Sequence, residues 1–202
     1  MEYDKENRAQ LTILVDMDDT LEHLLPAWLS WLNDTYLCNV TEEDIHSWNL
    51  CEAYPELTPE QVYGPLHNDM FWYDVKPYAA AGEVLRQFLQ DGHRVFIVTN
   101  THFRTLRTKM ERVLFRYFPF LDWDQVIVCS KKQMIRGDIL IDDGPHNLVG
   151  GDYIKLMMDQ PHNRGLDAAW LAENGVTRVY SWVQIAQIVD HIARTKGNDK
   201  KA

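Results

Sequence analysis

Four short apolar runs each end in side chains that can do chemistry. In chain order, the groups are Asp16–Thr20 after Leu11–Val15, Thr99 and Asn100 after Val95–Val98, Cys129–Lys132 after Val126–Val128, and Asp142 and Asp143 after Ile139–Ile141. Residues two apart on an extended chain point the same way, so Asp16 and Asp18 can face one side together. Clustered carboxylates repel one another unless a cation binds among them, and hard oxygen ligands suit Mg²⁺. The pattern therefore predicts a magnesium site.

The runs themselves predict the scaffold. They are continuous rather than alternating, which is typical of strands buried on both faces of a parallel sheet. Two further strand candidates are Ile154–Met158 and Arg178–Tyr180. Helical patterns are expected at 79–90, 104–118, 166–174 and 182–194, with the tail from Lys196 frayed. Alternating strands and helices predict a three-layer α/β domain with a parallel sheet, in which ligands bind beyond the carboxyl edge.

One interval is too long for a single crossover helix. Between the first two runs lie about 80 residues, and residues 21–74 of this stretch are rich in aromatic side chains. Thr41 is expected as the N-cap of one helix there, and Thr58 followed by Pro59 as the start of another. We expect a helical cap at 21–74, inserted into an α/β core made of 1–20 and 75–202.

Composition excludes several classes of protein. The 202 residues, 46% apolar and 25% charged, fit one globular domain with an insertion. A net charge of −10 argues against a partner that is a nucleic-acid polymer. No run approaches the ~18 apolar residues of a membrane helix, and Met1–Gln10 is too polar for a signal peptide. Three scattered cysteines, without a CxxC pair, favour the cytoplasm.

The four strand ends together resemble the haloacid-dehalogenase-like (HAD) superfamily of phosphohydrolases. Its motifs are DxDxT, a Thr or Ser, a Lys, and an acidic pair, and they correspond in order to Asp16–Thr20, Thr99, Lys132 and Asp142–Asp143. Within that superfamily the chain looks like the 5′(3′)-deoxyribonucleotidases. That likeness is carried by the motifs Phe71–Tyr73, Pro77 and His162–Arg164, and by Lys132 standing ten residues before Asp142.

The resemblance implies a Mg²⁺-dependent phosphomonoesterase. Asp16 would be the nucleophile that forms an aspartyl-phosphate, and Asp18 the acid and base for the leaving alcohol and the water. Mg²⁺ would be held by Asp16, Asp142 and the main-chain carbonyl of Asp18, with Asp143 acting through water or orienting its neighbour. Lys132, Thr99 and Asn100 would hold the phosphate oxygens. The substrate expected is a nucleoside monophosphate, bound by a monomer or homodimer.

The cap is expected to choose the substrate. Trp48 and Trp72 are candidates for stacking on a nucleobase, and for both the alternative is a place in the core of a small helical cap. The chain departs from the nucleotidase pattern at Leu24 and near Leu66, where the family carries aromatic side chains. Base identity and the preference for deoxyribose therefore stay open at this point.

Two other functions are compatible with parts of the pattern. A HAD phosphatase acting on a sugar phosphate or another small phosphorylated metabolite would use the same motifs. A non-catalytic phosphate-binding or signalling module also groups carboxylates, Thr and Lys at strand ends. However, a receiver module has its acidic pair first and its lysine last, whereas DxDxT comes first here. The absence of HxH and HExxH spacings argues against zinc.

Overall fold

A computed structural model describes residues 8–199. Its centre is a parallel sheet of six strands in the order β3-β2-β1-β4-β5-β6. The strands are β1 (Thr12–Val15), β2 (Arg94–Thr99), β3 (Val126–Val128), β4 (Ile139–Asp142), β5 (Ile154–Met158) and β6 (Val176–Val179). The predicted α/β class is confirmed. The sixth strand starts earlier than expected because Gly175, at φ +62°, ends the preceding helix and the strand follows at once.

Helices connect the strands. The α-helices are α1 (Leu24–Tyr36), α2 (Pro59–Tyr63), α3 (Ala81–Gln90), α4 (Leu106–Lys109), α5 (Phe115–Tyr117), α6 (Pro145–Leu148), α7 (Ala168–Asn174) and α8 (Trp182–Asp199). A π-helical turn, η6 (Met110–Leu114), separates α4 from α5 within the single helix predicted at 104–118. The expected fraying from Lys196 is wrong, because α8 continues and the Lys196 ammonium lies 2.7 Å from Asp138.

The remaining short helices are 3₁₀ turns. They are η2 (Glu42–Asp44), η3 (Leu50–Glu52), η4 (Gly64–His67), η5 (Phe71–Tyr73), η7 (Trp123–Gln125), η8 (Lys132–Met134) and η9 (Pro161–Asn163). Four of them lie between β1 and β2, where the sequence predicted helices only in general terms.

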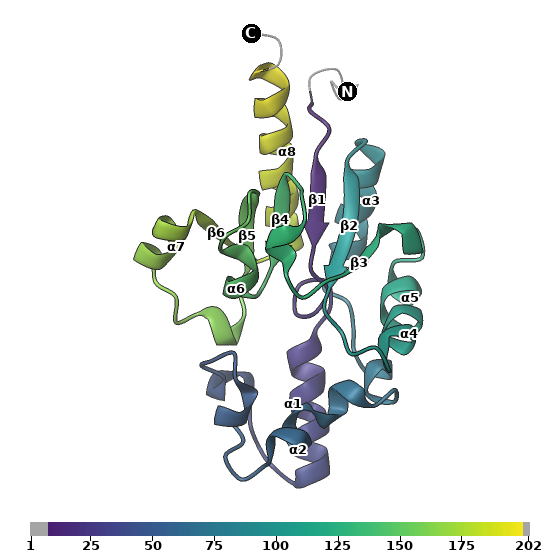
Figure 1. Cartoon of the computed structure of the whole chain (residues 1–202), viewed down its shortest axis with the longest axis vertical. Helices are drawn as coiled ribbons and strands as arrows, with labels where there is room; N and C mark the ends of the chain where they lie inside the picture. Colours follow the sequence, from purple (N-terminus) through teal and green to yellow (C-terminus); the bar gives the residue numbers. More distant parts are fainter. Residues whose placement is uncertain (1–7, 200–202) are drawn as a thin grey trace.

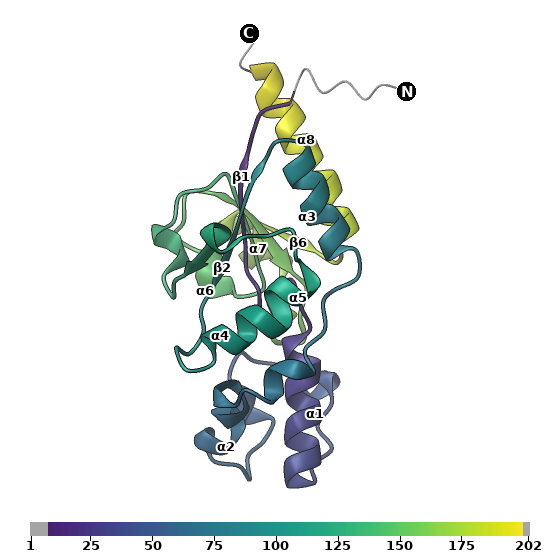
Figure 2. The same ribbon diagram turned by 90° about the vertical axis from the view of Figure 1, so that its right-hand side faces the viewer.

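Side-chain alternation on β1 divides the core between the two faces of the sheet. Ile13 and Val15 join the larger apolar cluster, which also contains residues of α3, η6 and α8. Leu14, on the opposite face, joins a smaller cluster with residues of α6 and α7. Seen from the side, α3 and α8 lie together along one face of the sheet (Figure 2). This arrangement leaves the carboxyl edge of the strands free of covering core helices.

Residues 21–74, a part of the chain between β1 and α3 that we call the insert, lie beyond that carboxyl edge (Figure 1). It has its own apolar cluster, formed by Leu25, Leu29, Leu32, Ile45, Leu50, Tyr54 and Val62. Thr41 precedes η2, and Thr58 caps α2 with Pro59 at its first position, as predicted. The domain boundaries at 20/21 and 74/75 stay predictions. Residues 1–7 and 200–202 of the predicted core lie outside the described residues.

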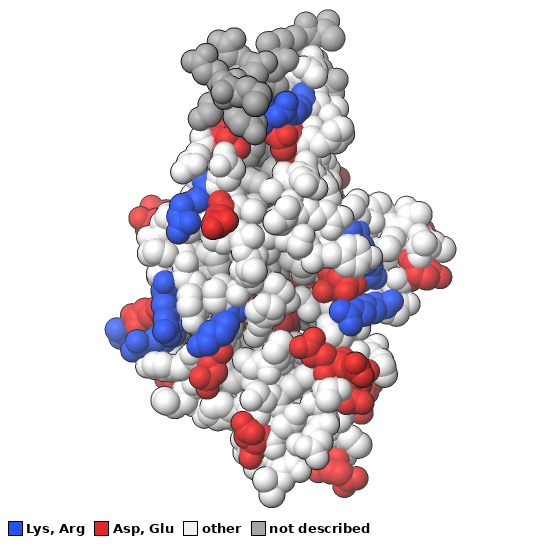
Figure 3. Space-filling view, turned by 180° about the vertical axis from the view of Figure 1, so that it is seen from behind, with Lys and Arg blue, Asp and Glu red and all other residues white. Residues whose placement is uncertain are grey.

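Charge is divided unevenly between the insert and the rest of the chain. Residues 21–74 contain ten Asp and Glu and no Lys or Arg, so the insert carries a formal charge of −10, equal to that of the whole chain. Outside it, twenty acidic residues balance twenty basic ones. From behind, the lower part of the molecule shows acidic side chains, and the basic ones lie above it (Figure 3).

Within residues 8–199, no helix combines the length and apolar character that a bilayer crossing requires. The cytoplasmic location and the monomeric or dimeric state expected from the sequence stay predictions.

Candidate active site

The loop after β1 is fixed on several sides. The Asp16 amide donates to the carbonyl of Ile141 at 2.8 Å, which ties the end of β1 to β4. Asp19 adopts a left-handed φ of +50°, and its carboxylate accepts a 2.8 Å hydrogen bond from the amide of Leu25 in α1. Gln160 donates to the Asp19 carbonyl at 2.6 Å. The loop therefore connects the sheet edge directly to the insert.

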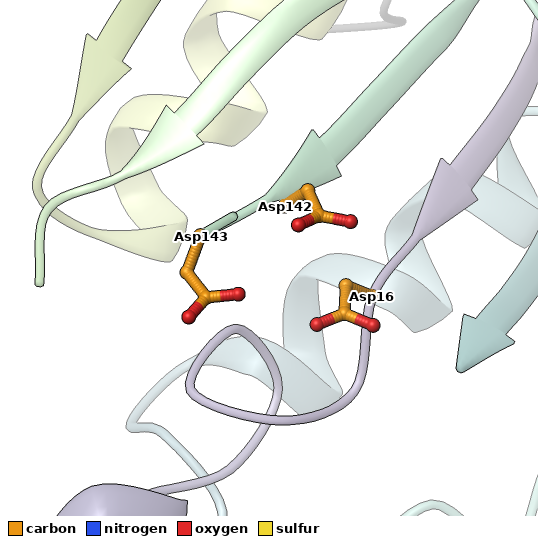
Figure 4. Close-up of side chains that lie close together, drawn as sticks. All are labelled: Asp16, Asp142 and Asp143. Carbon is orange, nitrogen blue, oxygen red and sulfur yellow. The ribbon is translucent and has the colours of Figure 1, made fainter. Parts of the chain in front are cut away.

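Three buried carboxylates converge at this edge (Figure 4). Asp16 follows β1, Asp142 ends β4 and Asp143 comes directly after it, and one oxygen from each lies within 4.8 Å of the others. Asp142 Oδ1 accepts hydrogen bonds from the Gly144 amide at 2.8 Å and from Asn147 Nδ2 at 3.0 Å. The second oxygen of Asp142 is left for other partners.

Lys132 supplies a positive charge to this cluster. Its Nζ donates to Asp142 Oδ2 at 2.6 Å and to Asp16 Oδ1, and its side chain is almost fully buried. Burial by itself lowers the pKa of a lysine, but Asp16 and Asp142 outweigh it and raise the pKa of Lys132. The ammonium group is therefore charged at any physiological pH.

The acidic cluster has the chemistry of a divalent-cation site. Burial raises the pKa of Asp16 and of Asp142, and neighbouring carboxylates raise both further in spite of Lys132. A single lysine thus does not balance three carboxylates, and a hard divalent cation takes oxygen ligands of this kind. Asp143 was expected to act behind the ligands, but its carboxylate lies in the same cluster as Asp16 and Asp142.

Asp18 contacts a different lysine. Lys109 Nζ lies 2.6 Å from an Asp18 carboxylate oxygen and donates to Thr99 Oγ1 at 3.1 Å. Lys109 is fully buried and sits 4.9 Å from the centroid of the Trp72 ring. Glu22 forms a main-chain bridge with Asp18. Burial, and after it the Asp18 charge, raises the pKa of Glu22 well above its usual value. The Asp18 side of the site is thus a second charge network, in which Lys109 and Glu22 are buried and Asp18 is partly exposed.

Lys109 was missed by the sequence interpretation. A signal for it exists, because Lys109 stands three residues after Leu106 and four before Val113, on the apolar stripe of the predicted helix. A lysine on such a stripe needs a buried anion as a partner. The π-helical turn that starts at the next residue, Met110, is not visible in the sequence; turns of this kind often occur at functional sites.

A pocket of about 260 Å³ opens between these carboxylates and the insert. Asp16, Asp18, Lys132 and Asn100 from the core line it together with Trp48 from the insert. Trp48 is 54% exposed. Its ring packs edge to face against His146 and His162, with ring centroids 4.6 and 4.8 Å apart. Thr99 is fully buried, with its hydroxyl at Lys109. Its predicted phosphate contact stays a prediction.

The structure does not bring Trp72 to the pocket. Its side chain is 2% exposed and packs against Phe71 and Lys109 in the main apolar cluster. The suggestion that Trp72 stacks on a base is therefore wrong, because the apolar core already surrounds this ring. Trp72 acts instead as part of the wall around Lys109.

Comparison with known proteins decides the family. A family model described as "5′ nucleotidase, deoxy (Pyrimidine), cytosolic type C protein" matches residues 10–196. The chain belongs to this nucleotidase family. It is 33% identical over 175 residues to a 5′(3′)-deoxyribonucleotidase of Bacillus subtilis (strain 168), covering 86% of this chain and 95% of that protein. A 5′(3′)-deoxyribonucleotidase of Clostridium acetobutylicum is 26% identical over 183 residues, covering 90% and 96%.

Solved structures confirm the HAD fold of this nucleotidase-family chain. A HAD family hydrolase from Deinococcus radiodurans R1, solved with phosphate and sodium, superposes with a TM-score of 0.60. The match covers 89% of this chain and 94% of that one at 15% identity, which shows the fold alone. Family membership and fold together identify the chain as a hydrolase of phosphomonoesters.

Proposed function

We propose that the chain is a Mg²⁺-dependent 5′(3′)-deoxyribonucleotidase that releases phosphate from nucleoside monophosphates through an aspartyl-phosphate on Asp16. The observation that carries the proposal is the convergence of Asp16, Asp142 and Asp143 with Lys132 at one end of a pocket large enough for a small organic ligand. The 33% identity to a 5′(3′)-deoxyribonucleotidase supports the substrate class.

The metal would be held by the carboxylates of Asp16, Asp142 and Asp143 and by the main-chain carbonyl of Asp18. When bound, Mg²⁺ would supply the positive charge that lets a carboxylate approach a dianionic phosphate. The ligand set is all oxygen, as that ion prefers, and the side chains of Asp16, Asp142 and Asp143 are buried.

Asp16 is the nucleophile in this proposal. It attacks phosphorus, and the bond from phosphorus to the alcohol oxygen breaks as the aspartyl-phosphate forms. Asp18 gives its proton to the departing alcohol, and it then takes a proton from the water that hydrolyses the aspartyl-phosphate. Lys132 offsets charge on the phosphate oxygens while it holds Asp16, and Asn100 donates from the lining of the pocket.

Phosphate release tests the proposal. Deoxynucleoside, ribonucleoside and sugar monophosphates are compared with Mg²⁺ and with EDTA, using wild type, Asp16→Asn and, as a control, Asp152→Asn at an exposed position. The expected result is Mg²⁺-dependent turnover of nucleotides that Asp16→Asn abolishes and Asp152→Asn retains. Acid quenching of a reaction with ³²P-labelled substrate should trap label on Asp16. Near-normal turnover by Asp16→Asn contradicts the nucleophile.

The same phosphate-release assay distinguishes a nucleotidase from a phosphatase that acts on sugar phosphates. Faster release from sugar phosphates than from any nucleotide would make the chain a sugar phosphatase with the same chemistry. We favour the nucleotide because the insert presents an apolar and aromatic surface to the pocket, which suits a flat base better than a polyhydroxylated ring.

A further inference from the structure

The motif His162–Arg164, which the proposed reaction does not use, lies beside the acidic cluster. Its first two residues belong to the 3₁₀ turn η9, and both contact Asp143. Asn163 Nδ2 donates to the Asp143 carbonyl at 2.9 Å, and His162 Nε2 lies 3.0 Å from Asp143 Oδ2. Neighbouring residues of one turn therefore contact the main chain and the side chain of the same aspartate.

The turn η9 is tied to the sheet by several hydrogen bonds. Asn163 is fully buried, and its Nδ2 also donates to the carbonyl of Met158 in β5 at 2.8 Å. Arg178 of β6 donates to Oδ1 and to the main-chain carbonyl of Asn163, at 2.5 and 3.0 Å. Gln160, just before the turn, donates to the Asp19 carbonyl in the loop after β1. The turn is thus a fixed support for the His162 side chain.

The His162 ring has Asp143 as its polar partner. The side chain of His162 is 7% exposed and that of Asp143 is 4% exposed. His162 Nε2 is buried, and apart from Asp143 the described residues give it no hydrogen-bond partner. Leaving a buried N–H unpaired is unfavourable, so the contact with the Asp143 carboxylate satisfies this nitrogen.

The insert reaches the same histidine through Trp48. The Trp48 ring packs edge to face against His162, with ring centroids 4.8 Å apart, and it packs in the same way against His146 of α6. The His162 ring therefore lies between a residue of the acidic cluster and an aromatic ring of the insert. Packing of this kind restricts rotation of the imidazole and keeps Nε2 directed at Asp143.

We propose that His162 is a positioning residue that holds the Asp143 carboxylate in place for a divalent cation, and that Trp48 fixes the His162 ring from the insert. The proposal rests on the Mg²⁺-dependent function proposed above and deepens it, because the affinity for the cation then depends on a residue of the insert. Carboxylates that ligate metals are themselves held by hydrogen bonds, and loss of such a partner weakens metal binding by about 10- to 100-fold.

Calorimetric titration of the metal-free protein with Mg²⁺, in the absence of substrate, tests the role of His162. His162→Phe keeps a ring for Trp48 to pack against and removes the nitrogen, so we expect the Kd for Mg²⁺ to rise about 10- to 100-fold. His162→Gln places an amide N–H near the position of Nε2 and should bind Mg²⁺ more tightly than His162→Phe does. His191→Phe, at an exposed position of α8, is the matched control and should leave the Kd unchanged.

Trp48→Ala tests the contribution of the insert without changing His162. Removal of the ring frees one side of the imidazole, so the Kd for Mg²⁺ should rise roughly 2- to 30-fold, the range for side chains that act through a packed neighbour. Trp123→Ala removes a ring of similar exposure, 51% against 54%, that is not part of the pocket lining. The Kd should not change in this control, and an unchanged Kd in Trp48→Ala contradicts the role of the insert.

The outcomes separate this proposal from the proposed function. A wild-type protein that does not bind Mg²⁺ contradicts the Mg²⁺-dependent function, and the proposal fails with it. If the wild type binds Mg²⁺ and His162→Phe binds it equally well, the proposal alone fails. A higher KM for nucleotides at an unchanged Kd for Mg²⁺ also overturns it, because His162 would then contact the substrate. A merely structural role would lower the Tm of His162→Phe in EDTA and leave the Kd of the folded protein unchanged, which again contradicts the proposal.

Discussion

The ammonium group of Lys109 lies 2.6 Å from a carboxylate oxygen of Asp18, although 91 residues separate the two in the chain. Lys109 is fully buried and the Asp18 side chain is 26% exposed at the pocket, so salt screens this pair less than it screens a pair on the open surface. The same ammonium also donates to Thr99, which joins the ends of β1 and β2 through one side chain. Lys109 therefore fixes the direction of the Asp18 side chain.

Lys109→Met should lower kcat for nucleoside monophosphates by about 100-fold or more, the range expected when a general acid loses its alignment. The loss on 4-nitrophenyl phosphate should be smaller, because its leaving group needs less help from an acid. Lys109→Arg should restore part of the activity, and Arg107→Met, at an exposed position of the same helix, should change neither rate. Equal losses on both substrates would mean that Lys109 acts on phosphate binding instead.

Mg²⁺ should raise the Tm of the metal-free protein, because binding to the folded state alone adds stability. In Asp143→Asn the Mg²⁺ concentration that gives the same rise should be about 10- to 100-fold higher. Asp152→Asn, at an exposed position, is the matched control. Thermal denaturation across a Mg²⁺ titration measures both. A wild-type Tm that does not respond to Mg²⁺ contradicts the metal site.

Leu37→Gly should stabilise the fold by roughly 0.5–1 kcal/mol, because Leu37 ends α1 in the left-handed region at φ +56°. The side chain is 89% exposed, so little packing is lost. Leu37→Ala is the control, since it removes the same exposed surface but keeps the Cβ that causes the strain. Urea denaturation should give a gain for the glycine alone, and an equal gain in both variants would rule out the conformational explanation.

His93 should make stability fall in mild acid. Its Nδ1 accepts a hydrogen bond from the Leu11 amide. Burial lowers its pKa below 6.5 and outweighs the opposite effect of Asp91, while the Arg8 charge lowers the pKa as well. Between its folded pKa and 6.5 the unfolded chain binds the proton more tightly, so the free energy of unfolding decreases as pH falls through that window.

Comparison with His93→Gln isolates this effect from the buried carboxylates, whose raised pKa values act in the opposite direction. The difference in unfolding free energy between wild type and His93→Gln should shrink from pH 7.5 to 5.5. His191→Gln, at an exposed position, should follow the wild type. Parallel curves for wild type and His93→Gln would exclude the histidine as the source.

The residues that meet at the carboxyl edge of the sheet could be predicted from two general properties of parallel sheets. A buried parallel strand reads as a continuous apolar run, as in Leu11–Val15, and the carboxyl ends of parallel strands share one edge. Asp16 and Asp142 could therefore be brought together before any coordinates were known. The N-caps at Thr41 and Thr58 were equally readable, because capping depends on the side chain of one residue and the few that follow it.

Side-chain environment was harder to predict than position along the chain. In the sequence Trp72 and Trp48 look alike, because both belong to the aromatic-rich stretch 21–74. Tertiary packing places the Trp72 ring in the core and the Trp48 ring beside the pocket. Whether the Asp143 carboxylate joins the cluster of Asp16 and Asp142 depends on the turn after β4, which the Asp-Asp pair alone does not specify. Lys109 could have been predicted only by asking why a charged side chain stands on the apolar stripe of a helix, since such a residue needs a buried partner.

The concentration of charge in residues 21–74 gives the molecule a permanent electric dipole along its long axis, with the negative pole at the insert. A dianionic substrate then approaches against this field, and dissolved ions weaken it. We expect kcat/KM to rise at least about twofold from 10 to 150 mM ionic strength, as the Debye length shortens from about 30 to 8 Å.

Removing acidic charge from the insert should weaken the dependence of kcat/KM on ionic strength. Glu52→Gln, Glu56→Gln and Glu60→Gln combined change three exposed positions outside the pocket lining. The triple variant should show higher kcat/KM at low salt and a smaller rise, whereas a kcat/KM that falls with added salt contradicts the field. Polyphosphorylated and polymeric anions meet a stronger barrier than a monophosphate does, so the dipole sorts ligands by valence before any of them reaches the carboxylate cluster.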